Sequence, residues 1–184
     1  MSQKRNGFTL IELLLVIGIL GILAAIGLST FSGAIIKGKD GRRKSDLSQI
    51  AKALELYKND FGEYPDDDSD GGMVGCQEDS GVTLITCPTV SGAFKRKKNS
   101  QVVKYLDILP EEVDNDRRYY YQRTGSGADL GFSLYSALEN TNDRDVKKDA
   151  GGDPDPDGWS VNCGDPSGSP VCNYKLTNTG VMTQ

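Results

Sequence analysis

Two acidic segments carry residue types at the spacing that calcium-binding loops use. Residues 66–71 read D-D-D-S-D-G and residues 153–158 read D-P-D-P-D-G, so both fit the pattern D-x-D-x-D-G. In the first half of a calcium loop, oxygen ligands recur at alternate positions and a glycine then makes the sharp turn. The pattern therefore predicts carboxylate ligands for Ca2+: Asp153, Asp155 and Asp157 in the second segment and, as a weaker site, Asp66, Asp68 and Asp70 in the first.

Neither segment completes an EF-hand loop. The twelfth loop position, which is a glutamate in that motif, is Gln77 after the first segment and Gly164 after the second. The two prolines of the second segment are also incompatible with the standard EF-hand backbone. The alternative is that both segments are solvated acidic loops without a metal.

The composition excludes several kinds of chemistry. The chain has no histidine, and it contains neither a nucleophile paired with a base nor a glycine-rich phosphate loop, so we do not expect an enzyme. The net charge of −5 argues against bulk binding of nucleic acid or anionic membranes. The cysteines form two close pairs, Cys76 with Cys87 and Cys163 with Cys172, which favours disulfides in an oxidising compartment over free thiols or a zinc site.

Glu12 is a carboxylate at the start of a long apolar run. Residues 13–36 carry no charge and span about 36 Å as a helix, enough to cross the ~30 Å hydrocarbon core of a membrane. The run is too long for the apolar part of a plain secretory signal. A plain membrane anchor does not explain Glu12, because a carboxylate within lipid costs about 3 kcal/mol and usually has a partner.

The residues around Glu12 resemble a known processing signal. Residues 4–13, K-R-N-G-F-T-L-I-E-L, are similar to the type III signal of bacterial type IV pilins and pseudopilins. The resemblance implies that prepilin peptidase removes a leader after Gly7 and N-methylates the new terminal residue, Phe8. It also implies that Glu12 pairs with the amino group of a neighbouring subunit, so that a wrongly staggered subunit leaves a buried charge unmatched.

The same resemblance implies how the chain is organised. We expect a leader at residues 1–7, a transmembrane or fibre-core helix at 8–36, an amphipathic continuation of that helix at 37–61, and a globular sheet domain with acidic loops at 62–184. The implied assembly is a homo-oligomer, a helical filament that an inner-membrane assembly platform builds from subunits held in the membrane.

Apolar residues recur at helical spacing beyond the apolar run. They lie three or four positions apart, at Leu47, Ile50, Leu54, Tyr57 and Phe61. This pattern predicts an amphipathic helix that ends near Gly62, because Tyr64-Pro65 disfavours further helix. We therefore expect an α+β fold in which a long N-terminal helix packs on a small antiparallel β-sheet with long loops.

The pattern after the helix predicts short strands and one short helix. Strands are predicted at residues 82–85, 117–123, 130–138 and 171–176, with a turn at 124–127. Residues 102–106 are predicted to form a short helix. Residues 92–98, G-A-F-K-R-K-K, form a basic run. We interpret it as an exposed loop or a contact to an acidic face of the next subunit, and DNA binding is the less favoured interpretation.

A second, looser resemblance covers the C-terminal part of the chain. Leu109-Pro110, the tyrosines at 119–121, F-S-L-Y-S at 132–136 and Gly158-Trp159 together resemble the major pseudopilin of type II secretion. In those pseudopilins, the loop after the strand binds calcium and holds the carboxyl end in place. The resemblance adds Asp143 and the backbone carbonyl near Leu138 as further calcium ligands.

These observations favour a structural subunit. Our leading interpretation is a type IV pilin that polymerises through its N-terminal helix into an extracellular, cell-surface filament for adhesion or motility. The alternative is a type II secretion pseudopilin that forms a short periplasmic pseudopilus for protein export. An interpretation from another class is a monomeric, membrane-anchored protein that binds calcium or DNA, which would have no need of Glu12.

Overall fold

The structure is a computed structural model. It describes residues 8–77, 84–87, 92–126, 130–155, 158–164 and 170–182, without the side chains of residues 26–30. The predicted leader, including Gly7, lies outside the described residues. Contacts divide the chain into two compact units, Met1–Gly38 and Lys39–Gln184, and each is described by itself.

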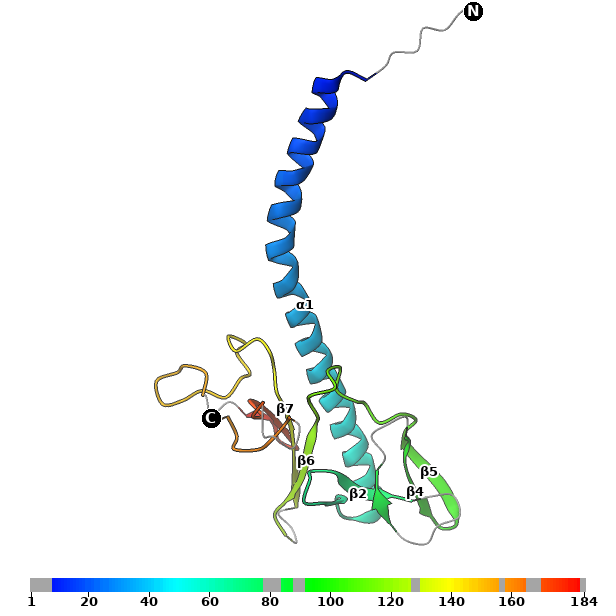
Figure 1. Ribbon diagram of the computed structural model, residues 1–184. Coiled ribbons are helices and arrows are strands. Elements are labelled where there is room, and N and C mark those ends of the chain that lie inside the picture. Colours follow the sequence, from blue (N-terminus) through cyan, green and yellow to red (C-terminus); the bar gives the residue numbers. More distant parts are fainter. Residues whose placement is uncertain are drawn as a thin grey trace, which may run out of the picture. The chain divides into compact units, whose positions relative to one another are not determined.

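The helix α1 (Leu10–Phe61) contributes to both units (Figure 1). It ends where the sequence predicts: Gly62 adopts a φ of 79°, and its N–H donates to the carbonyl of Lys58 at 2.7 Å. A glycine in this left-handed conformation is a common helix C-cap. Within the residues that the structure describes, no helix is both long enough and apolar enough to cross a membrane.

Short antiparallel strands make up the rest of the described second unit. They are β1 (Asp66–Asp67), β2 (Met73–Cys76), β3 (Ile85–Thr86), β4 (Phe94–Lys98), β5 (Gln101–Leu106), β6 (Tyr120–Thr124), β7 (Gly131–Ser136), β8 (Tyr174–Thr177) and β9 (Gly180–Met182). The pairing orders are β1-β2-β3, β4-β5 and β6-β7-β8-β9. Strand β7 lies inside the last sheet, and all of its residues are buried.

The helical stripe predicted from the sequence forms the core of the second unit. Leu47, Leu54 and Tyr57 are almost fully buried, and they share one apolar cluster with Phe132 and Leu134 of β7. Burying a large apolar side chain stabilises a fold by about 1.5–3 kcal/mol. The predicted α+β fold, with a long helix on antiparallel sheet, is therefore confirmed.

The prediction of a short helix at residues 102–106 is wrong. These residues belong to strand β5, which pairs with β4 in a hairpin. The turn consists of Asn99 and Ser100, both with positive φ (51° and 64°). Two consecutive residues with positive φ are typical of a two-residue hairpin turn, which usually contains glycine. Because this turn has no glycine, the hairpin had no clear sequence signal.

The other strand predictions are correct in place but not in length. The predicted strand 117–123 begins three residues later, at Tyr120, because Arg117 forms an isolated bridge to Gly164 instead. Part of the predicted strand 82–85 lies outside the described residues, and β3 covers Ile85–Thr86. Strands β1, β2 and β9 were not predicted.

Candidate functional site

The start of α1 is capped by reciprocal hydrogen bonds between Thr9 and Glu12. The Thr9 backbone N–H and hydroxyl donate to Glu12 Oε2 at 2.9 and 2.7 Å. In return, the Glu12 backbone N–H donates to Thr9 Oγ1 at 3.4 Å. This is a capping box, in which two side chains satisfy backbone groups that the first helical turn leaves without partners.

The capping box gives Glu12 a role that the sequence analysis missed. The signal was present, because Thr9-Leu10-Ile11-Glu12 reads T-x-x-E before an apolar run. In the single chain, the capping box holds the Glu12 carboxylate within one turn of Phe8, the predicted N-terminal residue of the mature chain. Phe8 itself is 82% exposed.

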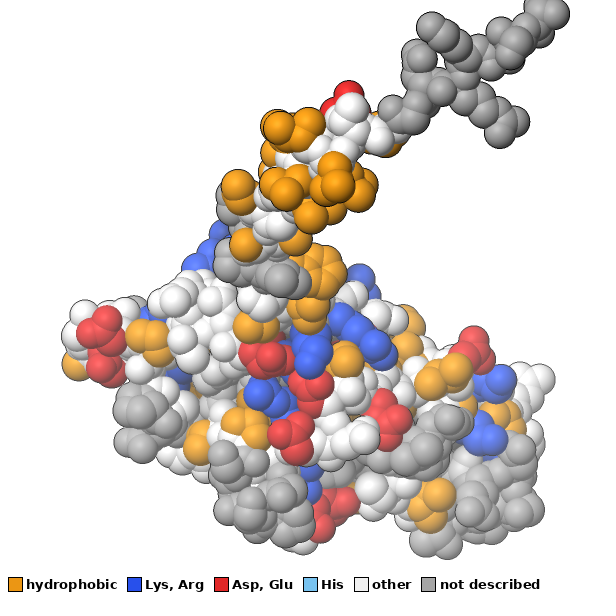
Figure 2. Space-filling view, turned by 45° about the horizontal axis from the view of Figure 1, so that its top comes forward, with side chains coloured by type: hydrophobic (Ala, Val, Ile, Leu, Met, Phe, Trp, Pro, Cys, Tyr) orange, Lys and Arg blue, Asp and Glu red, His pale blue; other side chains and the backbone are white. Residues whose placement is uncertain are grey.

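The described part of the N-terminal unit has an apolar surface (Figure 2). The exposed side chains include Leu10, Ile11, Leu14, Ile17, Leu20 and Leu23. These positions do not form one stripe, so the helix is apolar around its circumference rather than on one face. A helix of this kind is stable only where other apolar groups surround it.

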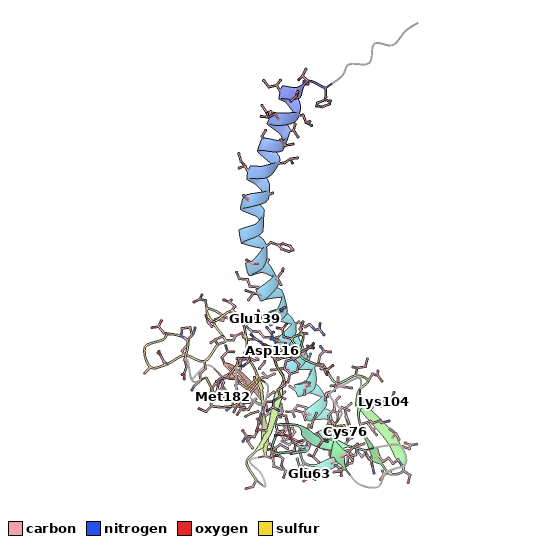
Figure 3. All side chains as sticks on the ribbon, viewed as in Figure 1. Glu63, Cys76, Lys104, Asp116, Glu139 and Met182 are labelled. Carbon is pink, nitrogen blue, oxygen red and sulfur yellow. A yellow bond between two sulfur atoms is a disulfide. The ribbon has the colours of Figure 1, made fainter. Side chains whose placement is uncertain are left out.

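A buried arginine joins α1 to two segments of the second unit. Arg43 is fully buried, and its guanidinium donates to Asp40, Glu112, Asp114 and Glu139 at 2.8, 2.8, 2.6 and 2.9 Å. Figure 3 shows Glu139 next to the helix, in the segment that follows β7. One cation therefore holds four carboxylates that come from three parts of the chain.

Lys39 balances some of the charge around Arg43. Lys39 Nζ donates to Asp114 Oδ1 at 2.7 Å. This hydrogen bond is the main reason why the pKa of Asp114 lies below its ordinary value. Acidic and basic side chains accordingly gather on the same face of the second unit (Figure 2).

The second predicted calcium segment is paired with lysine. Lys147 Nζ donates to Asp155 Oδ2 at 2.7 Å, and Lys44 Nζ donates to Asp143 Oδ1 at 2.6 Å. The carbonyl of Leu138 accepts a hydrogen bond from the Asn173 amide at 2.9 Å. Asp157, a further predicted ligand, lies outside the described residues.

Asp153, the remaining predicted ligand of this segment, joins the backbone of a tight turn. The Asp153 N–H donates to Asp149 Oδ1 at 3.0 Å, and its carbonyl accepts from the Asp149 N–H at 2.8 Å. The side chain of Asp153 is exposed. Of the described ligands predicted for calcium in this part of the chain, Asp143, Asp155 and the Leu138 carbonyl are therefore held by other protein groups, whereas the Asp153 carboxylate is exposed.

The first acidic segment is also used internally. Asp68 Oδ1 accepts the backbone N–H groups of Asp70 and Gly72 at 3.0 and 2.6 Å, and Asp66 forms an ion pair with Arg123. Asp66 and Asp68 thus contact different groups. Among the described residues, no group of three or more Asp, Glu, Cys or His side chains is placed to hold a metal ion.

Both predicted disulfides are formed. Cys76 pairs with Cys87 and Cys163 pairs with Cys172. All four cysteines are nearly or fully buried. The first bridge links β2 to the residue after β3. The second links Cys163, in the segment after Trp159, to Cys172, which lies shortly before β8.

The basic run is a strand rather than the predicted loop. Arg96 stacks over the rings of Phe61 and Tyr57, and Lys98 Nζ donates to Asp60 Oδ1 at 2.7 Å. The hydrogen bond from Lys98 is the main reason why the pKa of Asp60 is lowered. Arg96 and Lys98 therefore cover the end of α1.

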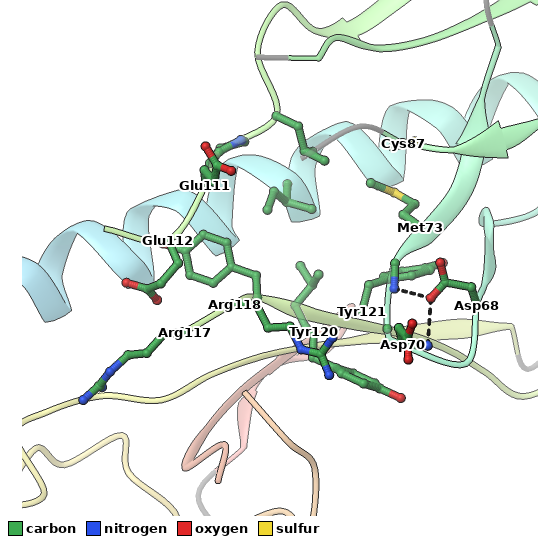
Figure 4. Close-up of a pocket in the computed structure, with 17 residues that line it drawn as sticks. Asp68, Asp70, Met73, Cys87, Glu111, Glu112, Arg117, Arg118, Tyr120 and Tyr121 are labelled. Carbon is green, nitrogen blue, oxygen red and sulfur yellow. Dashed lines mark hydrogen bonds between the residues drawn. The ribbon is translucent and has the colours of Figure 1, made fainter. Parts of the chain in front are cut away.

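A pocket of about 390 Å³ is lined by α1, by residues 68–73 and 109–121, and by Cys87 and Leu134 (Figure 4). Its apolar floor includes Ile50 and Leu134. Figure 4 shows Glu111 and Glu112 on one side and Asp68 and Asp70 on the other, with Arg118 between them. The sequence analysis did not predict this pocket, because no local pattern marks walls that come from separate segments.

The comparisons with known proteins agree with the N-terminal features. A family model described as the prokaryotic N-terminal methylation motif matches residues 2–28. The type II secretion system core protein G of Pseudomonas aeruginosa is 32% identical over 134 residues, which are 73% of this chain and 83% of that protein. The Vibrio cholerae protein of the same name is 36% identical over 118 residues, 64% of this chain and 71% of that protein.

A third relative matches over a shorter part. The type II secretion system core protein G of Pectobacterium carotovorum is 30% identical over 111 residues, which are 60% of this chain and 63% of that protein, less than two thirds of its length. No solved structure is similar to the chain at a significant level. The extent of the Pseudomonas and Vibrio matches, together with the methylation motif, shows that the chain belongs to the family of type II secretion system core protein G, the pseudopilins.

Proposed function

We propose that this protein is a pseudopilin subunit that polymerises through its N-terminal helix into a short periplasmic filament for protein secretion. The observation that carries the proposal is the apolar surface around the start of α1, interrupted by one carboxylate, Glu12. Residues 8–36 contain no other charged side chain. The helix thus combines a surface that must be covered with one group that must be paired.

Neighbouring copies of the same helix supply both requirements. Apolar side chains such as Leu14 and Ile17 are exposed in the single chain, and equivalent helices in a filament would bury them. Cleavage after Gly7 by prepilin peptidase would create an amino group at Phe8. In a low-dielectric filament core, pairing of that amino group with Glu12 of another subunit is strongly favoured over leaving either charge alone.

The similar proteins support secretion over adhesion. Our leading interpretation from the sequence was a cell-surface pilin for adhesion or motility. The relatives described above are instead type II secretion proteins, which supports the pseudopilin alternative. We accordingly propose that the subunit is held in the inner membrane before assembly. An inner-membrane assembly platform then adds it to the filament, which acts in the periplasm.

Deletion of the gene in its native host tests this proposal. We expect proteins normally found in the culture supernatant to accumulate in the periplasm, and plasmid-borne wild-type protein to restore their release. Surface filaments, examined by electron microscopy of sheared cells, should be unchanged by the deletion. Normal secretion together with loss of long surface fibres would contradict the proposal and support an adhesion or motility pilin.

A further inference from the structure

Lys44 fastens the loop that follows β7 to the helix. This loop comprises residues 139–158, of which 156 and 157 lie outside the described residues. Lys44 Nζ, on α1, donates to Asp143 Oδ1 at 2.6 Å and to Asp145 Oδ2 at 2.7 Å. One ammonium group therefore bridges two carboxylates of a loop that lies about a hundred residues further along the chain.

Lys147 fastens the other end of the same loop. Its Nζ donates to Asp155 Oδ2 at 2.7 Å and to the carbonyl of Gly158 at 2.5 Å. Gly158 has a φ of 50°, and a Cβ at this position would lie 2.2 Å from the carbonyl oxygen of Cys172. Only glycine fits there, so the carbonyl that Lys147 binds is held in place by close packing.

The Leu138 carbonyl, which was also predicted as a calcium ligand, accepts a hydrogen bond from nitrogen. Asn173 exchanges two hydrogen bonds with Leu138: its amide donates to the Leu138 carbonyl at 2.9 Å, and the Leu138 N–H donates to Asn173 Oδ1 at 2.7 Å. This pair joins the end of β7 to the residue before β8. The start of the loop is thus closed without a metal ligand.

We infer that Lys44 and Lys147 take the structural place of a bound cation, so that the described part of the 139–158 loop is held in its fold without calcium. Asp143 and Asp145 share the ammonium group of Lys44 and would otherwise repel one another, while Asp155 is neutralised by Lys147. A lysine ammonium is a compact charge with three donors, and each of these two groups contacts two oxygens.

The electrostatics of Lys44 agree with this role. Burial by itself would lower the pKa of Lys44, but the hydrogen bonds to Asp143 and Asp145 raise it above its ordinary value. Burial would likewise raise the pKa of Asp143, and the hydrogen bond from Lys44 lowers it. Both partners therefore stay charged at neutral pH.

Hydrogen exchange measured by mass spectrometry on the full mature chain in detergent micelles tests the inference. The wild type is compared in millimolar calcium and in chelator, and its peptides within residues 139–158 should exchange at the same rate in both. This arm needs no variant, so it does not depend on how well a mutant folds. Slower exchange of this loop in calcium would overturn the inference.

Two lysine variants and one control test which contacts hold the loop. Lys44→Gln should speed exchange around residues 143–147 by about tenfold, and Lys147→Gln should do the same around 155–159. Lys52→Gln is the matched control, because Lys52 is exposed on the same helix and the variant changes the charge equally. Exchange in the first two variants equal to that in Lys52→Gln would also overturn the inference. These readouts concern the folded subunit, so they are independent of whether it acts in secretion.

Discussion

Asp40 and Arg43 lie one turn apart on α1, and Arg43 Nη1 donates to Asp40 Oδ1 at 2.8 Å although both side chains are almost completely buried. The Asp40 carboxylate also accepts the backbone N–H groups of Glu139 and Asn140 at 3.0 and 2.8 Å. The pair therefore connects the helix to the segment after β7 through both side-chain and backbone groups.

Replacing Arg43 should strongly destabilise the second unit. Arg43→Ala leaves buried carboxylates of Asp40 and Glu112 without their cation, and breaking a buried ion pair from one side costs about 3–5 kcal/mol. We expect the free energy of unfolding, measured with urea, to fall by about that amount. Arg42→Ala is the control, because Arg42 is 60% exposed and forms one longer contact, 3.6 Å, to Asp46. An equal loss in both variants would contradict this account.

The contact between Lys44 and Asp143 should make stability depend on pH in the acid range. The pKa of Asp143 is lowered in the fold, so its contribution is present above the unfolded pKa of about 3.9 and is lost as pH falls through the folded pKa. At pH 7, Asp143→Asn should lower the melting temperature by about 2–4 °C. This difference from wild type should shrink toward zero as the pH falls below the lowered pKa of Asp143 in the folded protein. A difference that persists in acid would show that the carboxylate charge is not responsible.

The disulfide between Cys163 and Cys172 should stabilise the C-terminal part of the sheet. Both cysteines are fully buried, and a bridge that closes a short loop contributes about 2–3 kcal/mol. We expect the Cys163→Ser, Cys172→Ser double variant to melt several degrees below wild type in thermal unfolding followed by circular dichroism. Reductant should lower the melting temperature of the wild type further than that of the variant. Equal melting temperatures without reductant would contradict the prediction.

Glu12 should be needed for assembly rather than for processing. Glu12→Val removes the only charged side chain of residues 8–36, so the chain should still be cleaved after Gly7 and remain in the membrane fraction. Filaments seen by electron microscopy after overexpression should be absent. Glu12→Asp, which keeps the charge, serves as the control and should retain part of the filament yield. Normal filaments from Glu12→Val would exclude the proposed pairing with the Phe8 amino group.

Local patterns predicted the helix well. The apolar spacing from Leu47 to Phe61 follows from the helical period, and Gly62 ends the helix as its residue type suggests. The strand pair β6 and β7 was predicted because a glycine turn separates two apolar, aromatic segments. The β4–β5 hairpin was missed, because a basic strand and an Asn99-Ser100 turn have weak sequence signals.

The partners of the acidic loops could not be predicted from the sequence. The D-x-D-x-D-G pattern places carboxylates at metal-ligand spacing, but it does not show whether they bind a metal ion or the ammonium group of a lysine. Lys44 lies about a hundred residues from Asp143 and Asp145, and only the packing of the loop on α1 brings them together. The capping box of Thr9 and Glu12 differs, because its T-x-x-E signal is local and was available in the sequence.

Mass spectrometry of the N-terminal peptide of the protein isolated from its native cell envelope tests the central claim most directly. The account predicts a chain that begins at Phe8 and carries a methyl group on its amino terminus, in wild type and in Glu12→Val preparations from which filaments are missing. A chain that still begins at Met1, in cells where the protein is produced at its normal level, would contradict it.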